Sequence, residues 1–572
     1  MASLGVLALA GAIPIAVAFT LLVGFRWAAW KAMGVGWLIA SIFGFTLWNL
    51  EVTWWMASAI YGALSAVNII LIVFGAILLM NYLDVSGAIS TIRWHFTQIE
   101  SDPRVQLLLI GLGFETIIEG AAGFGTPGAL AAPLFIGLGF PPLGAAVFGL
   151  FFNAPNPPFG AAGTPPIGGV GAVMTPEILG GGSVQAFIKN VGAWTGVVTG
   201  LTYVFWGFLG VWFLAYWFGS ETERGSITRS LRSALEVGPF ALTLGLVAGL
   251  SQMAVAWFVG PALPDIAAGF LVLGVGIVMA NYDIMIPSDR WEFPDSDGWS
   301  DLWRGGLDLD EMAIEEPKRE MPVWLAWTPY LLVAALLLIT RWPTLYIGGQ
   351  QIVDVVSSFS VGFTVLGFSD LHWSVRYLYL PGTFPFIPIA IITGFLHGMD
   401  TEGMTEAWRE SIDQIIIPAI TLIVAVSMTQ VMIQSKVNPG DMLGMMQALS
   451  RVLALSAGGL LPIVSPWIGA LGAFMTGSNT SSDILFSVLQ YNAAEQVGIN
   501  PTIVVALQNV GGGIGNMVSV LNVAAICGVV GIGGREGDMM RKTIVPTAIY
   551  AVWAGLLGMI FIYLVPNAPM PF

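Results

Sequence analysis

Residues 105–140 contain two apolar arms that are each too short to cross a lipid bilayer. The arms cover 105–114 and 130–140, and a glycine-rich stretch with one proline, 115–129, joins them. A spanning helix needs about 20 apolar residues, so two shorter arms that meet at a Gly-Pro turn predict a hairpin that enters the membrane and returns to the same side. The remaining segments must be arranged around an element that does not cross.

Two carboxylates, Glu115 and Glu119, lie inside this predicted hairpin. Residues four apart face the same side of a helix. An acid at the middle of a spanning helix costs about 2.5–3.5 kcal/mol on insertion scales, and such residues usually have a function. We therefore expect Glu119, and with it Glu115, to take part in proton coupling or ligand contact.

The composition is that of an all-α polytopic membrane protein. Hydrophobic residues make up 56% of the 572 residues and charged residues only 10%, against about 25% in soluble domains. A single cysteine, Cys527, and three scattered histidines predict neither a disulfide framework nor a metal site, and no basic stripe suits a nucleic acid. We expect no cofactor, no metal and no nucleic-acid partner, and a protein surrounded by the lipid bilayer.

The charge balance is strongly acidic. The net charge is −15, and only five of the 20 basic residues are lysines. Acid-rich, lysine-poor loops indicate a salt-adapted source, a halophile, because carboxylates keep a surface hydrated when salt screens their repulsion. At about 1 M salt the Debye length is about 3 Å, so acidic loops would no longer repel an anionic substrate.

Twelve apolar segments outside the hairpins are expected to cross the membrane. Two of them are interrupted, 143–163 by prolines that follow Asn153 and 501–531 by glycines between Asn509 and Asn516. Breaks of this kind are tolerated only where the freed backbone groups face protein or a cavity, so both broken helices are expected to line a path through the protein. The other segments lie at 4–25, 32–50, 56–81, 191–218, 237–260, 264–286, 321–340, 383–398, 412–435 and 543–565.

The two halves of the chain repeat one another. A second interrupted hairpin, 462–497, has its apex at 476–483, and a broken helix follows each hairpin. The spacing also matches, with 36 residues from Gly87 to Gly123 and 37 from Gly440 to Gly477. The predicted organisation is a first half at 1–263, connecting spans at 264–382 with an acidic cytoplasmic loop at 288–320, and a second half at 383–572.

The basic segments that link the apolar segments indicate how the chain is oriented in the membrane. If each hairpin returns to its own side and every other segment crosses once, the links at 26–31, 93–104, 224–232 and 535–542 all fall on one side. The positive-inside rule makes that side the cytoplasm and places both termini outside the cytoplasmic membrane. The hairpins then enter from opposite sides, and inverted repeats with interrupted helices are typical of secondary transporters.

The candidate binding site lies where hairpin tips and broken helices would meet. A helix restarts after each apex, and its free N–H groups and positive dipole end suit a carboxylate anion. Nearby hydroxyls and amides add donors and acceptors. The candidate binding residues are Gly123, Gly125, Thr126, Asn153, Asn156, Ser478, Asn479, Thr480, Ser481, Asn509 and Asn516, and the candidate proton-coupling residues are Glu119, Asp483 and Glu115. Asp265 is expected at the membrane interface and the histidines at the surface.

Motifs spread over almost the whole chain are similar to those of one known protein family. They include Glu119-Gly-Ala-Ala-Gly-Phe-Gly-Thr-Pro, Phe159-Gly-Ala-Ala-Gly, Gly260-Pro-Ala-Leu-Pro-Asp265 and Thr476-Gly-Ser-Asn-Thr-Ser-Ser. In these the chain resembles the lactate permease family. The resemblance implies a transporter, not an enzyme, that imports L-lactate, D-lactate and glycolate with protons. The wider superfamily implies an elevator, in which two inverted hairpins sit on a transport domain that moves against a scaffold. A homodimer is one candidate assembly.

The chain departs from the family pattern at the second apex and the second broken helix. Asn479 and Asp483 stand exchanged relative to the usual order of acid and amide, and Asn516 stands where the family has a lysine. The stretch 478–480 is also similar to the sodium-site motif of dicarboxylate carriers, so Na⁺ is an alternative coupling ion to H⁺. A passive anion channel is a further alternative.

Overall fold

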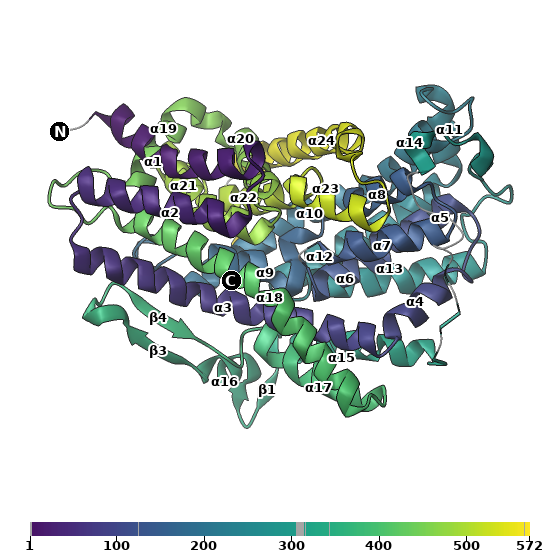
Figure 1. Ribbon diagram of the computed structural model, residues 1–572, viewed down its shortest axis with the longest axis horizontal. Helices are drawn as coiled ribbons and strands as arrows, with labels where there is room; N and C mark the ends of the chain where they lie inside the picture. Colours follow the sequence, from purple (N-terminus) through teal and green to yellow (C-terminus); the bar gives the residue numbers. More distant parts are fainter. Residues whose placement is uncertain are drawn as a thin grey trace.

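The computed structural model describes residues 3–123, 125–304, 314, 316–317, 319–342, 344–565 and 567–572. Figure 1 shows long helices that run along the longest axis of the molecule. Within the described ranges, ten helical segments are long and apolar enough to cross a membrane. This finding confirms a polytopic, mainly helical membrane protein, while the count of twelve crossings stays a prediction.

The helices of the first half follow the apolar segments of the sequence, with η marking short π-helical or 3₁₀ turns. Before the first hairpin they are α1 Leu4–Phe19, η1 Thr20–Gly24, α2 Ala29–Thr46, α3 Val52–Val85 and α4 Ala88–Phe96. The hairpin region has α5 Pro103–Leu108, η2 Leu109–Phe114, α6 Glu115–Ala121 and α7 Thr126–Gly137. After it come α8 Pro142–Phe151, η3 Pro157–Phe159, α9 Gly160–Thr164, η4 Pro165–Val170, α10 Val184–Phe218, α11 Ile227–Glu236 and α12 Gly238–Phe258.

The remainder of the chain holds the connector and the second half. The connector has α13 Pro264–Asn281, η5 Ser296–Gly298, α14 Asp301–Arg304, α15 Val323–Arg341, β1 Tyr346–Ile347, β2 Gln350–Gln351, α16 Ile352–Ser358, β3 Val361–Thr364, η7 Val365–Gly367 and β4 His372–Val375. The second half has η8 Gly382–Phe386, α17 Ile387–Leu396, α18 Thr401–Gln434, α19 Met445–Ala457, η9 Gly458–Leu460, α20 Leu461–Thr476, α21 Asn479–Val497, α22 Pro501–Asn516, α23 Val520–Val529 and α24 Glu536–Tyr563.

Two short antiparallel ribbons interrupt the helical architecture. β1 pairs with β2, and β3 pairs with β4 in a register that places Val361 opposite Val375 and Thr364 opposite His372. In Figure 1 both ribbons lie along one edge of the molecule, and β4 contacts α3. No pattern in the sequence predicted these strands.

Small residues let the long helices pack closely. α3 packs along α18, and Gly62 lies against the backbone of Ser427. α10 and α12 approach one another through Gly200 and Gly249. Small residues are favoured at helix contacts inside a membrane because packing there replaces the missing hydrophobic driving force.

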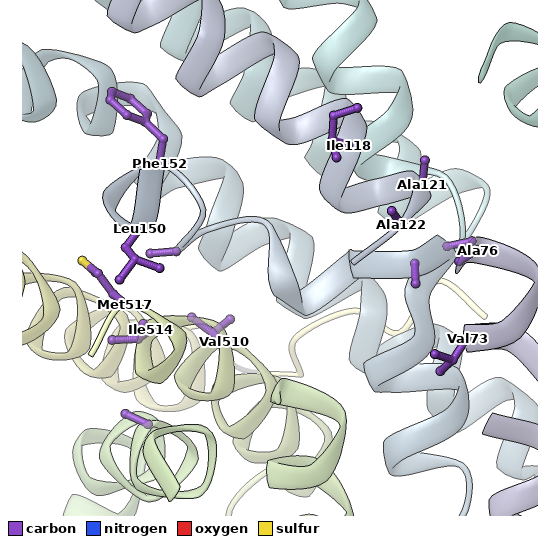
Figure 2. Packing of buried hydrophobic residues seen from close by; sticks show 14 of the residues in the cluster. Val73, Ala76, Ile118, Ala121, Ala122, Leu150, Phe152, Val510, Ile514 and Met517 are labelled. Atoms are coloured by element: carbon purple, nitrogen blue, oxygen red, sulfur yellow. The ribbon is translucent and has the colours of Figure 1, made fainter. Parts of the chain in front are cut away.

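Each hairpin packs against a short helical segment that follows the other hairpin in the chain. α7, in the first hairpin, contacts α23, where Gly128 lies against Ile526. α21, in the second hairpin, contacts η4, where Gly169 lies against the backbone of Thr480. Figure 2 shows part of the buried apolar cluster, to which α3, α6, α8 and α22 contribute residues. The four interrupted elements therefore meet in the interior.

The break in the second broken helix lies later than the sequence predicts. α22 continues without interruption through Gly511–Gly515, and the helix breaks only at 517–519. The glycines instead allow α22 to contact α20. Gly511 lies against the carbonyl of Pro466, and Gly515 lies against the carbonyl of Ala470. Glycines in a helical pattern can indicate either a break or close packing, and here they allow close packing.

Candidate functional site

The tips of the two hairpins enclose a small cavity between the broken helices. Its lining residues are Glu119, Gly123, Gly125, Pro157, Gly160, Thr164, Pro165, Gly477, Ser478, Asn479, Thr480 and Asn516. The cavity measures about 20 Å³. A cavity needs roughly 10–15 Å³ to hold one water molecule, so this arrangement is too tight for a lactate-sized anion until the tips move apart.

The first tip turns on glycines with left-handed backbones. Gly123 has φ +63° and Gly125 has φ +78°, a region that side chains with a Cβ avoid. Gly125 is the N-cap of α7 and lines the cavity, so the positive end of this helix faces it. Gly123 also lies against Ala161, which brings the first broken helix to the tip.

The second tip presents another helix N-terminus. α21 starts after Ser478, whose Oγ accepts a hydrogen bond from the N–H of Ser481 at 3.2 Å. Ser478, Asn479 and Thr480 all line the cavity. Two helix N-termini from different halves of the chain therefore meet at one cavity, and the positive ends of their dipoles suit an anion.

Glu119 is the acid that reaches the cavity. It is only 3% exposed, and Asn153 Nδ2 donates a hydrogen bond to its Oε2 at 2.9 Å. Its other oxygen lies against Gly160, where any Cβ would collide with it. The Asn153 amide and the Gly160 backbone thus hold the carboxylate in one orientation at the cavity wall.

The other two predicted coupling acids lie behind the cavity. Glu115 and Asp483 are fully buried, and within the described part of the chain their carboxylate oxygens have no hydrogen-bond partner. Asp483 packs with its Cβ on Gly169 of η4. A buried carboxylate without partners is costly as an anion, so the protonated form suits these positions.

Several predicted binding residues support the tips and do not line the cavity. Asn479 Nδ2 donates to Asn509 Oδ1 at 3.0 Å, and Asn509 Nδ2 donates to Pro158 O at 3.2 Å. Asn156 Oδ1 accepts from Thr116 Oγ1 at 3.2 Å. Asn153, Asn156, Asn509, Thr126 and Ser481 are therefore placed beside or behind the lining, whereas Gly123, Gly125, Ser478, Asn479, Thr480 and Asn516 form part of it.

Four further residues that line the cavity were not predicted from the sequence. Pro157, Gly160, Thr164 and Pro165 come from the first broken helix and its continuation. Between them Ala161, Ala162 and Gly163 have φ angles of 45°, 52° and 76°, a left-handed run that is strained for alanine. The Phe159-Gly-Ala-Ala-Gly motif marked this region in the sequence, and Gly160 of this motif lies against Glu119.

Asp265 and His397 correct two expectations. Asp265 is buried, with Gln252 Nε2 donating to its Oδ1 at 2.7 Å and its Cβ against Gly120, one residue after Glu119. It is not interfacial, because α13 packs directly on α6. His397 is also buried, between Ser86 Oγ at 2.8 Å and Leu325 O at 3.1 Å. Among the described residues no group of three or more His, Cys, Asp or Glu is arranged to hold a metal ion.

Comparisons with known proteins find relatives along most of the chain. A family model described as L-lactate permease matches residues 7–565. A putative L-lactate permease of Haemophilus influenzae is 30% identical over 92% of this chain and 93% of its own length. The glycolate permease GlcA of Escherichia coli is 28% identical over 98% and 97%, and an L-lactate permease of Bacillus subtilis is 28% identical over 80% and 78%.

Proposed function

The chain belongs to the L-lactate permease family, and from this premise we propose that it imports lactate, together with glycolate or similar 2-hydroxy monocarboxylates, by proton symport. One observation carries the proposal. Two helix N-termini and the buried acid Glu119 meet at a single cavity between the halves of the chain. The helix ends suit the substrate carboxylate, and Glu119 suits the proton.

The geometry supports a simple coupling rule. A carboxylate anion that binds beside Glu119 favours the protonated form of that side chain, because two adjacent carboxylates repel one another when both are ionised. The loaded site then carries one negative charge and not two, and the two helix N-termini, each equivalent to about +0.5 charge, offset it. Anion and proton would therefore move together.

Movement of the tips would give access to the site. We propose an elevator in which the two hairpins, 105–140 and 462–497, are re-entrant and inverted and carry the site against a scaffold. The cross-packing of α7 with α23 and of α21 with η4 supports a unit built from both halves. The basic links at 93–104 and 224–232 lead into α5 and α11. These two helices lie at the same end of the molecule in Figure 1, which supports the proposed cytoplasmic side. The location of both termini on the outer side of the cytoplasmic membrane stays a prediction. Assembly into a homodimer also stays a prediction.

Sodium coupling is a second candidate, and one observation favours it. Asn479 Oδ1 is buried at the second tip, between Ser478 and Thr480, and has no hydrogen-bond partner among the described residues. An amide oxygen and neighbouring hydroxyls are ligands that a hard cation prefers. H⁺ and Na⁺ must therefore be distinguished by experiment.

Uptake of labelled lactate into proteoliposomes tests the proposed function. We expect an inward pH gradient to drive accumulation above equilibrium in sodium-free buffer, and glycolate to compete. Accumulation that requires a sodium gradient and ignores pH would replace the proton with Na⁺. Flux that only equilibrates lactate under both gradients would indicate a channel.

Asn516, which lines the cavity, gives a directional test of substrate contact. Asn516→Lys should lower the KM for lactate, because a hydrogen bond to a charged group contributes about 1.5–3 kcal/mol, partly offset by desolvation of the ammonium. The maximal rate should fall as well, since tighter binding in one facing state slows release. Asn516→Leu should raise KM instead. Unchanged kinetics in both variants would remove the second broken helix from the carboxylate site.

A further inference from the structure

A larger cavity lies on the far side of η4 from the central site. Its main chamber, about 770 Å³, is bounded by α3, η4, residues 171–185 and the segment 369–380. An adjoining side chamber of about 250 Å³ reaches α10 and the end of α15, and the two share Asn68, Ile167, Gly171 and Arg376. We call the two chambers together the vestibule. Under the proposed orientation it opens to the outside.

The charged residues that line the side chamber are basic, although the chain as a whole is acidic. Lys189, Arg341 and Arg376 line it, and no Asp or Glu is among its described lining residues. The chain as a whole has 35 acids against 20 basic residues. Within the described ranges none of the three cations takes part in an ion pair. The main chamber does include two acids, and one of these, Glu177, pairs with Lys436 at 2.7 Å.

Arg341 is the basic residue that the side chamber holds in a fixed, buried position. It is only 3% exposed, its Nη2 donates to the carbonyl of Tyr379, and its guanidinium lies 3.7 Å from the centre of the Tyr379 ring. Its Nε and Nη1 are buried and find no partner among the described residues. A buried guanidinium with free N–H groups is stabilised by an anion, and a carboxylate is the anion whose geometry suits it well.

The vestibule is close to the central cavity. Pro165, at the start of η4, lines the central cavity, while Ile167 and Gly168 in the same turn line the vestibule. Asp483 and Thr480 of the second tip lie directly against Gly169. A single helical turn therefore separates the two spaces, and an anion held in the vestibule is already beside the central site.

We propose that the side chamber is a first binding site for the carboxylate of the substrate, with Arg341 as the direct contact and Arg376 and Lys189 as attracting charges. The inference rests on the proposed function and adds a second site to it. Positive charge at the mouth of a cleft raises the local concentration of an anion, and the gain falls with ionic strength. A site of this kind would offset the acidic surface of the chain.

Initial rates of lactate uptake into right-side-out membrane vesicles test this site. Arg341→Gln should raise KM about tenfold and leave the maximal rate within about twofold, while Arg341→Lys should restore most of the affinity. Arg376→Gln should raise KM about threefold at low salt and not at about 1 M salt, where the Debye length is about 3 Å. Arg451→Gln, which removes an exposed cation on α19, is the matched control and should behave as wild type.

A thiol-labelling experiment tests lactate binding in the vestibule without measuring transport. Ser374→Cys places a thiol in both chambers of the vestibule, in a Cys527→Ala background. Lactate should slow its reaction with a small charged thiol reagent, also when Glu119→Gln is present, and Arg341→Gln should remove that protection. If wild type carries lactate while Arg341→Gln has the KM of Arg451→Gln, or lactate at ten times KM gives no protection, the vestibule site is wrong although the proposed function stands. Failure of wild type to carry lactate would instead overturn the proposed function.

Discussion

Replacing Glu119 by glutamine is expected to abolish accumulation of lactate against its gradient. The amide keeps the size of the side chain and a hydrogen-bonding oxygen for Asn153 Nδ2, which now bonds Glu119 Oε2 at 2.9 Å. It cannot release a proton, so it fixes the site in the state that resembles protonated Glu119. Loaded carriers should still reorient, whereas empty carriers should return without having exchanged a proton.

Two assays separate the effects. In proteoliposomes with an imposed gradient of about 2 pH units, which can drive at most about a hundredfold accumulation at one proton per lactate, Glu119→Gln should reduce accumulation to simple equilibration. Exchange of internal for external lactate should survive within about tenfold. Glu495→Gln, an exposed acid on α21, makes the same chemical change outside the cavity and should accumulate lactate normally. Full accumulation by Glu119→Gln at every pH would remove Glu119 from proton coupling.

The tips were the part of the site that the sequence could predict. Gly123 and Gly125 stand between apolar arms too short to cross a bilayer, and Gly477 stands in the polar apex of the second interrupted hairpin. The structure places helix breaks with left-handed glycines at all three. Ser478 precedes a long helical segment, and it caps α21 as expected of a serine in that position. Local chemistry decides these features, so local sequence is enough to locate them.

Features that depend on neighbouring elements were not predictable. The glycines between Asn509 and Asn516 have the composition of a break, and only the presence of α20 beside them shows that they allow close packing. Asp265 follows Pro264 at the start of α13, a common place for an interfacial acid, and only the packing of α13 on α6 buries it. The vestibule cations Lys189, Arg341 and Arg376 come from three separate segments that no sequence spacing connects.

Contact with Glu119 explains why the first broken helix has a glycine at position 160. This contact also provides a test of where the Glu119 carboxylate lies. A Cβ at this position would overlap the Oε1 atom of Glu119 and would lie 3.2 Å from its Cδ. The carboxylate cannot move away freely because its other oxygen is held by Asn153 and the side chain is almost fully buried. Gly160→Ala must therefore push the Glu119 carboxylate from the cavity wall or separate α6 from α9.

We expect Gly160→Ala to reduce the rate of lactate uptake at least about tenfold. Leaving a buried polar group without its partner costs about 1–3 kcal/mol, and about 1.4 kcal/mol corresponds to a factor of ten. Gly274→Ala on α13 is the matched control, because a Cβ there meets no atom within 4 Å and alanine favours the helix. Both variants should be extracted as folded protein with similar thermal unfolding, so that the loss can be assigned to the site.

A second substitution distinguishes displacement of the carboxylate from general damage to the fold. Aspartate is one methylene shorter than glutamate, so Glu119→Asp in the Gly160→Ala protein returns space to the new methyl group while keeping an acid at the cavity. Glu119→Asp alone should be impaired because it withdraws the carboxylate from Asn153. If the double variant transports lactate faster than either single variant, the two positions are coupled as the structure requires. Additive losses, or wild-type uptake by Gly160→Ala alone, would show that Glu119 does not rest on Gly160 while the carrier works.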